Sequence, residues 1–225
     1  MYKRQVQVGP LSVGDERLGS VEAAVNSKGR FIGHRSVLPL NAFKVQSIDF
    51  DFRNNRIEFY DRRPIQPLRN ITTRIKYQDE SGLIFVPVKL NGKKGRALVD
   101  TGSDVTYVNT AFARLSGAKA EPEKTRRLIG TANHGVEVRV FSANRFQLGS
   151  HVMRRFDILA ADPPLFEHLG VAEDPVMVIG LDFLREFRVQ IDRKNTVILF
   201  GREQAPGSLG RHTINHHHKG RAPRY

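Results

Sequence analysis

Two short apolar segments joined by a tight turn constrain the fold of this chain more than any other feature. Residues Ile84–Leu90 read IFVPVKL, and Asn91-Gly92 opens the stretch NGKKG that follows. Asn-Gly before a second apolar run is typical of a β-hairpin, because both residues tolerate the left-handed backbone that a tight turn needs. We therefore predict a strand over 84–90 and a return strand over 96–99.

Most of the remaining pattern is also typical of strands. Further strands are expected over 136–141, 145–148, 156–160 and 196–200. Short helices are expected over 110–115, with Asn109 or Thr110 as the cap and Gly117 as the stop, and over 182–187. Many short strands separated by turn residues favour an all-β sandwich or barrel with one or two short helices.

Composition excludes several classes of protein. The 225 residues suffice for one large domain or two small ones, and the absence of cysteine excludes a disulfide scaffold and a thiolate zinc site. The formal net charge is +13, but the basic residues are scattered and match no nucleic-acid-binding motif, so a nucleic-acid partner is not expected. No run is long enough for a transmembrane segment. A periplasmic or a cytoplasmic location fits equally well.

The second strand of the hairpin ends abruptly in Asp100-Thr101-Gly102-Ser103. A glycine lets the backbone approach the carboxylate closely, and two hydroxyls can hold its geometry. A carboxylate activates water for peptide hydrolysis only with a partner acid, and two neighbouring carboxyl groups share one proton. The alternative is a turn aspartate that only caps backbone amides.

Several stretches together resemble one known family. ALVDTGSDVTYVN, which contains Asp100, is similar to the active-site loop of retropepsin-like aspartic proteases, the retroviral type that includes bacterial members. VMVIGLDFL (176–184) resembles the second signature of the family, and LIGTANHG (128–135) lies where its flap hairpin is expected. FRVQIDRKNTVILF (187–200) resembles the closing strands. The match covers about residues 78–201, one complete unit.

The resemblance implies an acid-protease fold, a closed β-barrel or sandwich, and an aspartic endopeptidase that acts on peptides or unfolded proteins without a metal or cofactor. It makes Asp100 the catalytic carboxylate, with Thr101 bonding across two loops, Gly102 in the turn and Ser103 bonding a carboxylate oxygen. The flap and the second signature contribute the other expected site residues: Thr131, Ala132, Asn133, His134 and Gly135, then Ile179, Gly180 and Asp182, a structural acid. The alternative is an inactive dimerisation or peptide-binding module.

The first part of the chain echoes the last part. Val6–Val25 resembles Phe141–Ala160, and Asp51–Phe59 resembles Asp192–Phe200, although chance similarity between strand-rich segments is the alternative. We predict four regions on this basis: 1–60, the truncated C-terminal half of a first unit; 61–77, a linker; 78–201, the complete unit; and 202–225, a disordered basic tail. Met1–Gln5 resembles an adapter remnant, so we expect a fragment that lacks its natural N-terminus.

The mechanism needs two acids, and the sequence offers one Asp-Thr-Gly loop. The second carboxylate is expected either from a homodimer or from tandem units that pair within one chain. Asp49 and Asp51 are not followed by Thr-Gly, so neither is expected to replace it. We expect this chain to be weakly active or inactive as a monomer.

Overall fold

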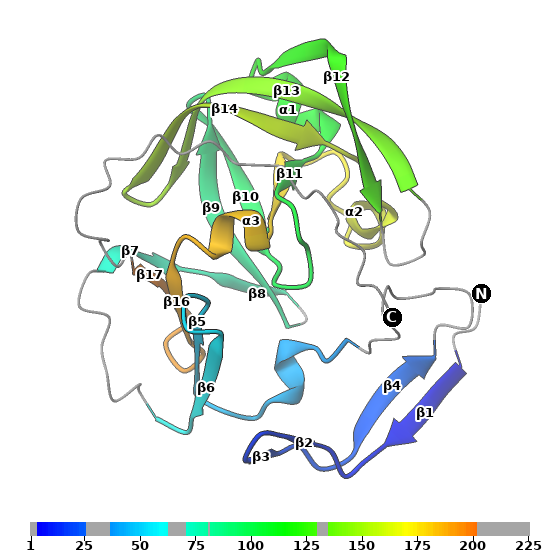
Figure 1. The fold of residues 1–225 in the computed structure, drawn as a ribbon, viewed down its shortest axis with the longest axis vertical. Coiled ribbons are helices and arrows are strands. Elements are labelled where there is room, and N and C mark those ends of the chain that lie inside the picture. The colour runs from blue at the N-terminus through cyan, green and yellow to red at the C-terminus, as the bar shows by residue number, and fades with distance from the viewer. Residues whose placement is uncertain (1–3, 26–36, 63–70, 81, 130–134, 202–225) are drawn as a thin grey trace, which may run out of the picture.

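The structure, a computed structural model, describes residues 4–25, 37–62, 71–80, 82–129 and 135–201 (Figure 1). Its strands are β1 Arg4–Val8, β2 Ser12–Val13, β3 Glu16–Arg17, β4 Val21–Val25, β5 Ser47–Asp51, β6 Arg56–Tyr60, β7 Ile71–Lys76, β8 Gln78–Glu80, β9 Leu83–Leu90, β10 Lys93–Val99, β11 Tyr107–Val108, β12 Lys119–Ile129, β13 Gly135–Leu148, β14 His151–Ala160, β15 Val176–Ile179, β16 Arg188–Asp192 and β17 Val197–Gly201. Its helices are a 3-10 turn at Leu40–Ala42, α1 Thr110–Leu115, α2 Pro164–His168 and α3 Leu181–Leu184. The predicted all-β class is confirmed.

The largest sheet closes on itself as a barrel. Its strand order is β12-β13-β14-β11-β15-β10-β9-β8, and a further pairing of β13 with β9 joins the two sides. The closing contact sets Phe146 opposite Leu90. Two pairs in this sheet, β10 with β15 and β11 with β14, are parallel, which brings the ends of β10 and β15 to the same edge. The barrel is the element that positions the candidate site.

The predicted hairpin at the start of the barrel is confirmed. β9 and β10 pair antiparallel across Asn91 and Gly92, whose φ angles of 47° and 83° are the left-handed values that the turn requires. The side chains of Val86, Val88 and Leu90 alternate into the core along β9, as expected for a strand with one buried face. The Asn91-Gly92 pair thus predicts a turn that involves only the two strands next to it in the sequence.

A second sheet packs against the barrel and has the order β6-β5-β16-β17-β7. One hydrophobic cluster contains side chains of both sheets, among them Ile48 and Phe200 from this sheet and Phe146 from the barrel. The expected linker over 61–77 needs a correction, because residues 71–76 form β7 and pair with β17. Thr73 and Ile75 are buried there, which explains why this segment is a strand.

The N-terminal strands form two small hairpins. β1 pairs with β4, and β2 pairs with β3, and among the described strands neither pair joins the larger sheets (Figure 1). Leu18 is buried in the same hydrophobic cluster as the two larger sheets. The N-terminal hairpins therefore pack on the core through Leu18 and, less completely, through Leu11 and Val21 at the start of β4.

The two predicted helices are present. Asn109 caps α1 by accepting a hydrogen bond from the Phe112 amide at 2.9 Å. The second helix, expected over 182–187, is the shorter α3, Leu181–Leu184. Phe183 and Phe187 are buried in the core. None of the helices in the described ranges is both long and apolar enough to cross a membrane.

Candidate active site

Asp100 stands directly after β10, where that strand runs parallel to β15. The preceding side chains, Leu98 and Val99, are buried, and the Asp100 amide donates a hydrogen bond to the Ile179 carbonyl at 3.0 Å. This bond fixes the first residue of the loop against the neighbouring strand end. Asp100 itself is only partly buried. The backbone that carries the carboxyl group is thus fixed by strand pairing, while the side chain remains partly accessible to solvent.

The turn after Asp100 orients its carboxylate. The Gly102 amide donates a hydrogen bond to Asp100 Oδ1 at 2.8 Å, and a Cβ atom at Gly102 would lie 3.1 Å from the same oxygen. Any side chain at this position would therefore crowd the carboxylate. The Ser103 hydroxyl donates to the Val105 carbonyl at 2.8 Å, not to Asp100 as expected. In this chain the backbone amide, rather than the serine hydroxyl, bonds the carboxylate oxygen.

The surroundings of Asp100 favour its protonated form. Burial raises the pKa of Asp100 above its ordinary value of 3.8, and hydrogen bonds from the backbone amides of Gly102 and Ser103 offset only part of that effect. Burial and the nearby Asp100 charge raise the pKa of Tyr107 to about 12. A carboxyl group that takes up a proton more readily than usual suits proton sharing with a second acid.

The second signature packs closely against the Asp100 loop. A Cβ atom at Gly180 would lie 2.5 Å from the Val105 carbonyl oxygen, so only glycine allows this approach. The next residue, Leu181, donates its amide hydrogen to the Ser103 carbonyl at 2.8 Å. Ile179 lies in β15 and accepts from Asp100, as described above. The two expected signatures are therefore brought together by parallel strand pairing.

Thr106 ties the two loops together and was not among the expected site residues. Its hydroxyl donates to Asp182 Oδ1 at 2.6 Å and accepts from the Gly180 amide at 3.0 Å, and its amide donates to Asp182 Oδ2 at 2.9 Å. Both oxygens of Asp182 are occupied, which supports the structural role expected of that acid. The sequence signal was a single polar residue between Val105 and Tyr107.

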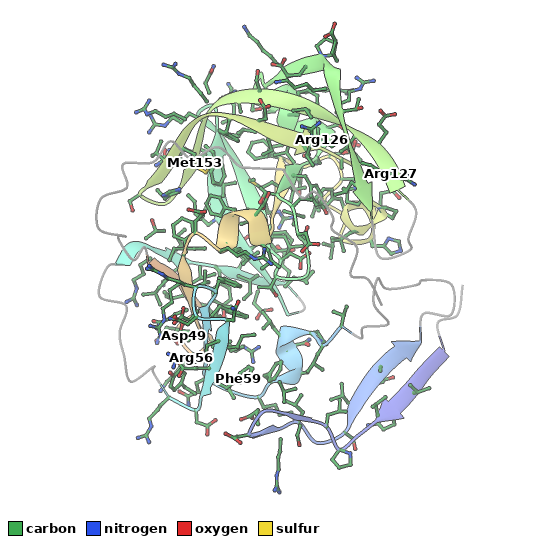
Figure 2. All side chains as sticks on the ribbon, in the orientation of Figure 1. Asp49, Arg56, Phe59, Arg126, Arg127 and Met153 are labelled. Carbon is green, nitrogen blue, oxygen red and sulfur yellow. The ribbon has the colours of Figure 1, made fainter. Side chains whose placement is uncertain are left out.

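The hairpin expected to cover the site is formed by β12 and β13, which pair from Lys119 and Ser142 to Ile129 and Gly135. Leu128 on β12 packs against the hydrophobic cluster that contains Tyr107, so this hairpin adjoins the Asp100 region. Arg126 and Arg127 directly precede Leu128 on β12 (Figure 2). The predicted flap residues Thr131, Ala132, Asn133 and His134 lie outside the described residues, and Gly135 opens β13.

The acids of the N-terminal segment have structural partners. Asp49 accepts hydrogen bonds from Arg188 and Gln190, and Asp51 accepts from the amide and side chain of Asn54. Neither carboxylate is available as a partner for Asp100 in this arrangement. The described part of the chain contains no group of three or more histidine, aspartate or glutamate side chains that could hold a metal ion.

Two kinds of comparison with known proteins found matches to this chain. Residues 86–183 match the model of the aspartyl protease family, which confirms the resemblance that the sequence indicated. A retropepsin-like aspartic protease from Rickettsia conorii aligns over 58% of this chain and 89% of its own, with 18% identity and a TM-score of 0.43. The EIAV protease in complex with the inhibitor HBY-793 aligns over 45% of this chain and 84% of its own, with 21% identity and a TM-score of 0.32. No curated protein matches the chain.

Proposed function

We propose that this chain carries the catalytic carboxylate of an aspartic endopeptidase and that Asp100 is that group. The observation that supports it best is the local geometry: a partly exposed carboxyl group, fixed by the Gly102 amide and with a raised pKa, at the meeting point of the two family signatures. A capping aspartate held by backbone amides would have a lowered pKa, whereas burial raises the pKa of Asp100 despite the hydrogen bonds from the amides of Gly102 and Ser103.

The reaction requires a second carboxyl group from a paired unit. In aspartic proteases the two groups hold one proton between them. The ionised group takes a proton from water, the water oxygen attacks the carbonyl carbon, and the protonated group donates to the carbonyl oxygen. Collapse of the tetrahedral intermediate breaks the C–N bond and transfers a proton to the leaving amine. In this chain Asp100 supplies one of the two carboxyl groups.

The substrate class follows from the strands beside the site. An extended peptide can bind beside a strand through main-chain hydrogen bonds, largely independent of its sequence. The hairpin of β12 and β13 adjoins the Asp100 region and would cover such a peptide and exclude water. We therefore propose peptides or unfolded proteins as substrates.

An Asp100→Asn variant tests the proposal. Asparagine keeps the acceptor for the Gly102 amide but cannot serve as the base, so cleavage of a denatured protein should fall by about 100- to 10,000-fold. Cleavage is measured by peptide release over a range of acidic to neutral pH, with the unfolding temperature of each variant recorded in parallel.

The matched control is Asp104→Asn in the same loop, where the acid is exposed. This variant should cleave at the rate of the unchanged protein. Equal and measurable cleavage by Asp100→Asn and the unchanged protein would reject the proposal. No cleavage by either, with the fold intact and a second unit present, would favour the peptide-binding module.

A further inference from the structure

The hairpins β5–β6 and β16–β17 have the same register. A constant shift of 141 residues takes the pair Ser47–Tyr60 to Arg188–Gly201 and the pair Asp51–Arg56 to Asp192–Val197. Every pair in the first hairpin therefore has a counterpart in the second. This is the structural form of the echo between Asp51–Phe59 and Asp192–Phe200.

Their turns also match in detail. Asp51 accepts hydrogen bonds from the amide and side chain of Asn54 at 3.1 and 2.8 Å, and Asp192 accepts from Asn195 in the same way at 3.1 and 2.7 Å. The next residue adopts a left-handed backbone in both turns, with φ of 51° at Asn55 and 50° at Thr196. The likeness therefore extends to side-chain chemistry.

The two hairpins meet edge to edge in a symmetric register. β5 pairs antiparallel with β16, with Asp51 opposite Arg188, Asp49 opposite Gln190 and Ser47 opposite Asp192. When each residue is replaced by its equivalent 141 positions away, the pair Asp51–Arg188 becomes Asp192–Ser47, which is the pair at the other end of the ladder. The central pair Asp49–Gln190 becomes Gln190–Asp49 and is therefore unchanged. The pairing thus has a local two-fold axis at Asp49–Gln190, the arrangement of two equivalent subunits in a dimer.

One side chain breaks this symmetry. Asp49 has an exposed fraction of 0% and accepts hydrogen bonds from Arg188 Nε and Nη2 at 2.9 and 2.8 Å and from Gln190 at 2.7 Å. Figure 2 labels Asp49 on this sheet, with Arg56 and Phe59 nearby on β6. Glu58, which lies 3.6 Å from Arg188, adds a second carboxylate. The acid at the axis therefore comes from β5 alone.

Pairing of β16 with a second copy of itself would lack this acid. Gln190 would then face Gln190 of the other copy, and Arg188 would face an Asp192 that already bonds Asn195. Two largely buried guanidinium groups would lose their fully buried partner, and a buried charge without a partner is costly. The sequence thus favours β5, rather than the β16 strand of a second copy, as the strand that pairs with β16.

We propose that the β5–β6 hairpin occupies, within one chain, the place that a second copy's β16–β17 hairpin would take in a symmetric dimer, and that Asp49 selects it. The β16 edge is closed to a second copy. If the proposed function holds, the carboxyl partner of Asp100 is delivered on the side of the N-terminal segment rather than by a β16-paired homodimer. The interface itself does not depend on proteolysis.

Engineered cysteines test which chain supplies the neighbour of β16, because the natural chain has no cysteine. Phe50 and Val189 lie directly opposite each other. A Phe50→Cys/Val189→Cys chain should form a disulfide within one chain and run as a monomer without reductant. A Gln190→Cys chain, the matched control, should stay an unlinked monomer, because Gln190 would meet its own copy only in a homotypic pair. Covalent Gln190→Cys dimers, or covalent dimers from mixed Phe50→Cys and Val189→Cys chains, would overturn the proposal.

Conservative substitutions test the role of Asp49. Asp49→Asn and Arg188→Gln should each lower the unfolding temperature by roughly 10 °C, because the first takes from Arg188 its fully buried carboxylate partner and the second takes from Asp49 its guanidinium partner. The double variant should lose less than the sum of the two, since both remove the same interaction. Unchanged unfolding temperatures in both single variants would overturn the selective role of Asp49. These readouts are mass and stability, so they are independent of whether the chain cleaves peptides.

Discussion

The N-terminal segment (residues 4–60) and the C-terminal segment (residues 139–201) share strand registers but differ in their surroundings. A shift of 135 residues takes the pair Arg4–Val25 of β1 and β4 to Arg139–Ala160 of β13 and β14. The same shift takes Ser12–Arg17 to Gln147–Val152. Hairpin register is therefore specified by local sequence in both segments.

The surroundings decide how much of each hairpin is buried. β14 pairs with β11 as well as β13, and its Met153, Phe156 and Ile158 are buried. β1 and β4 pair only with each other among the described strands, and Val8 at the end of β1 is exposed. The comparison teaches that hairpins with the same register bury very different amounts of apolar side chain, depending on the strands beside them.

The largest expected difference comes from equivalent apolar positions. Phe156 is 5% exposed and packs edge-to-face on Phe146 at a centroid distance of 6.3 Å, so Phe156→Ala should cost about 4 kcal/mol of unfolding free energy. Its counterpart Val21 is half-buried, and Val21→Ala should cost about 1 kcal/mol. Denaturant unfolding of both variants measures the two costs. Equal costs would show that burial does not distinguish the segments.

Equivalent glycines give the next largest difference. Gly14 and Gly149 have nearly equal φ angles of 58° and 56°, so alanine carries a backbone penalty of about 1 kcal/mol at each. A Cβ at Gly149 would also lie 2.4 Å from Thr73 Cγ2, whereas nothing lies within 4 Å at Gly14. Gly149→Ala should therefore cost about 2 kcal/mol more than Gly14→Ala.

The clash at Gly149 can be relieved separately. Thr73→Ser removes the methyl group that the new side chain would meet and keeps the hydroxyl that accepts from the Ser150 amide at 3.0 Å. The Gly149→Ala/Thr73→Ser variant should recover part of the additional cost in thermal unfolding, because the hydroxyl oxygen of residue 73 would still lie 2.9 Å from the new Cβ. If it does not, the two glycines differ for a reason other than the contact with β7.

Local signals in the sequence predicted local structure well. Asn91-Gly92 fixed a hairpin turn, and Asn109 capped α1, because each acts on residues within one turn. Features that depend on distant partners were missed. β7 reads as a linker and becomes a strand only by pairing with β17. Thr106 is held by Asp182, 76 residues away along the chain. The C-terminal end of α3 also differs from the prediction, which placed it at residue 187. The amides of Glu186 and Phe187 donate to carbonyls three residues earlier instead of four, so the α-helix ends at Leu184.

The smallest and most specific difference is in the response to pH. Burial raises the pKa of Asp51, but hydrogen bonds from Asn54 and the charges of Arg188 and Arg56 outweigh it, so the net pKa is lowered from 3.8. Asp51 therefore contributes stability at neutral pH, and this contribution is lost as pH falls through its lowered pKa. The pKa of Asp100 is raised, so the folded chain binds its proton more readily than the unfolded chain. The contribution of Asp100 to the stability of the folded chain is therefore smallest at pH values above its raised pKa, where the side chain is ionised.

Asparagine at the two positions should consequently act with opposite sign. Asp51→Asn should lower the unfolding temperature at pH 7, and the loss should shrink as pH falls below 3.8. Asp100→Asn should raise the unfolding temperature at pH 7, because it removes a partly buried charge, and the gain should shrink as pH falls toward 3.8. Thermal unfolding of both variants between pH 3 and 7 measures the two slopes. Slopes of the same sign would mean that Asp100 is stabilised by its loop, as a capping aspartate is, and would count against its assignment as the reactive carboxyl group.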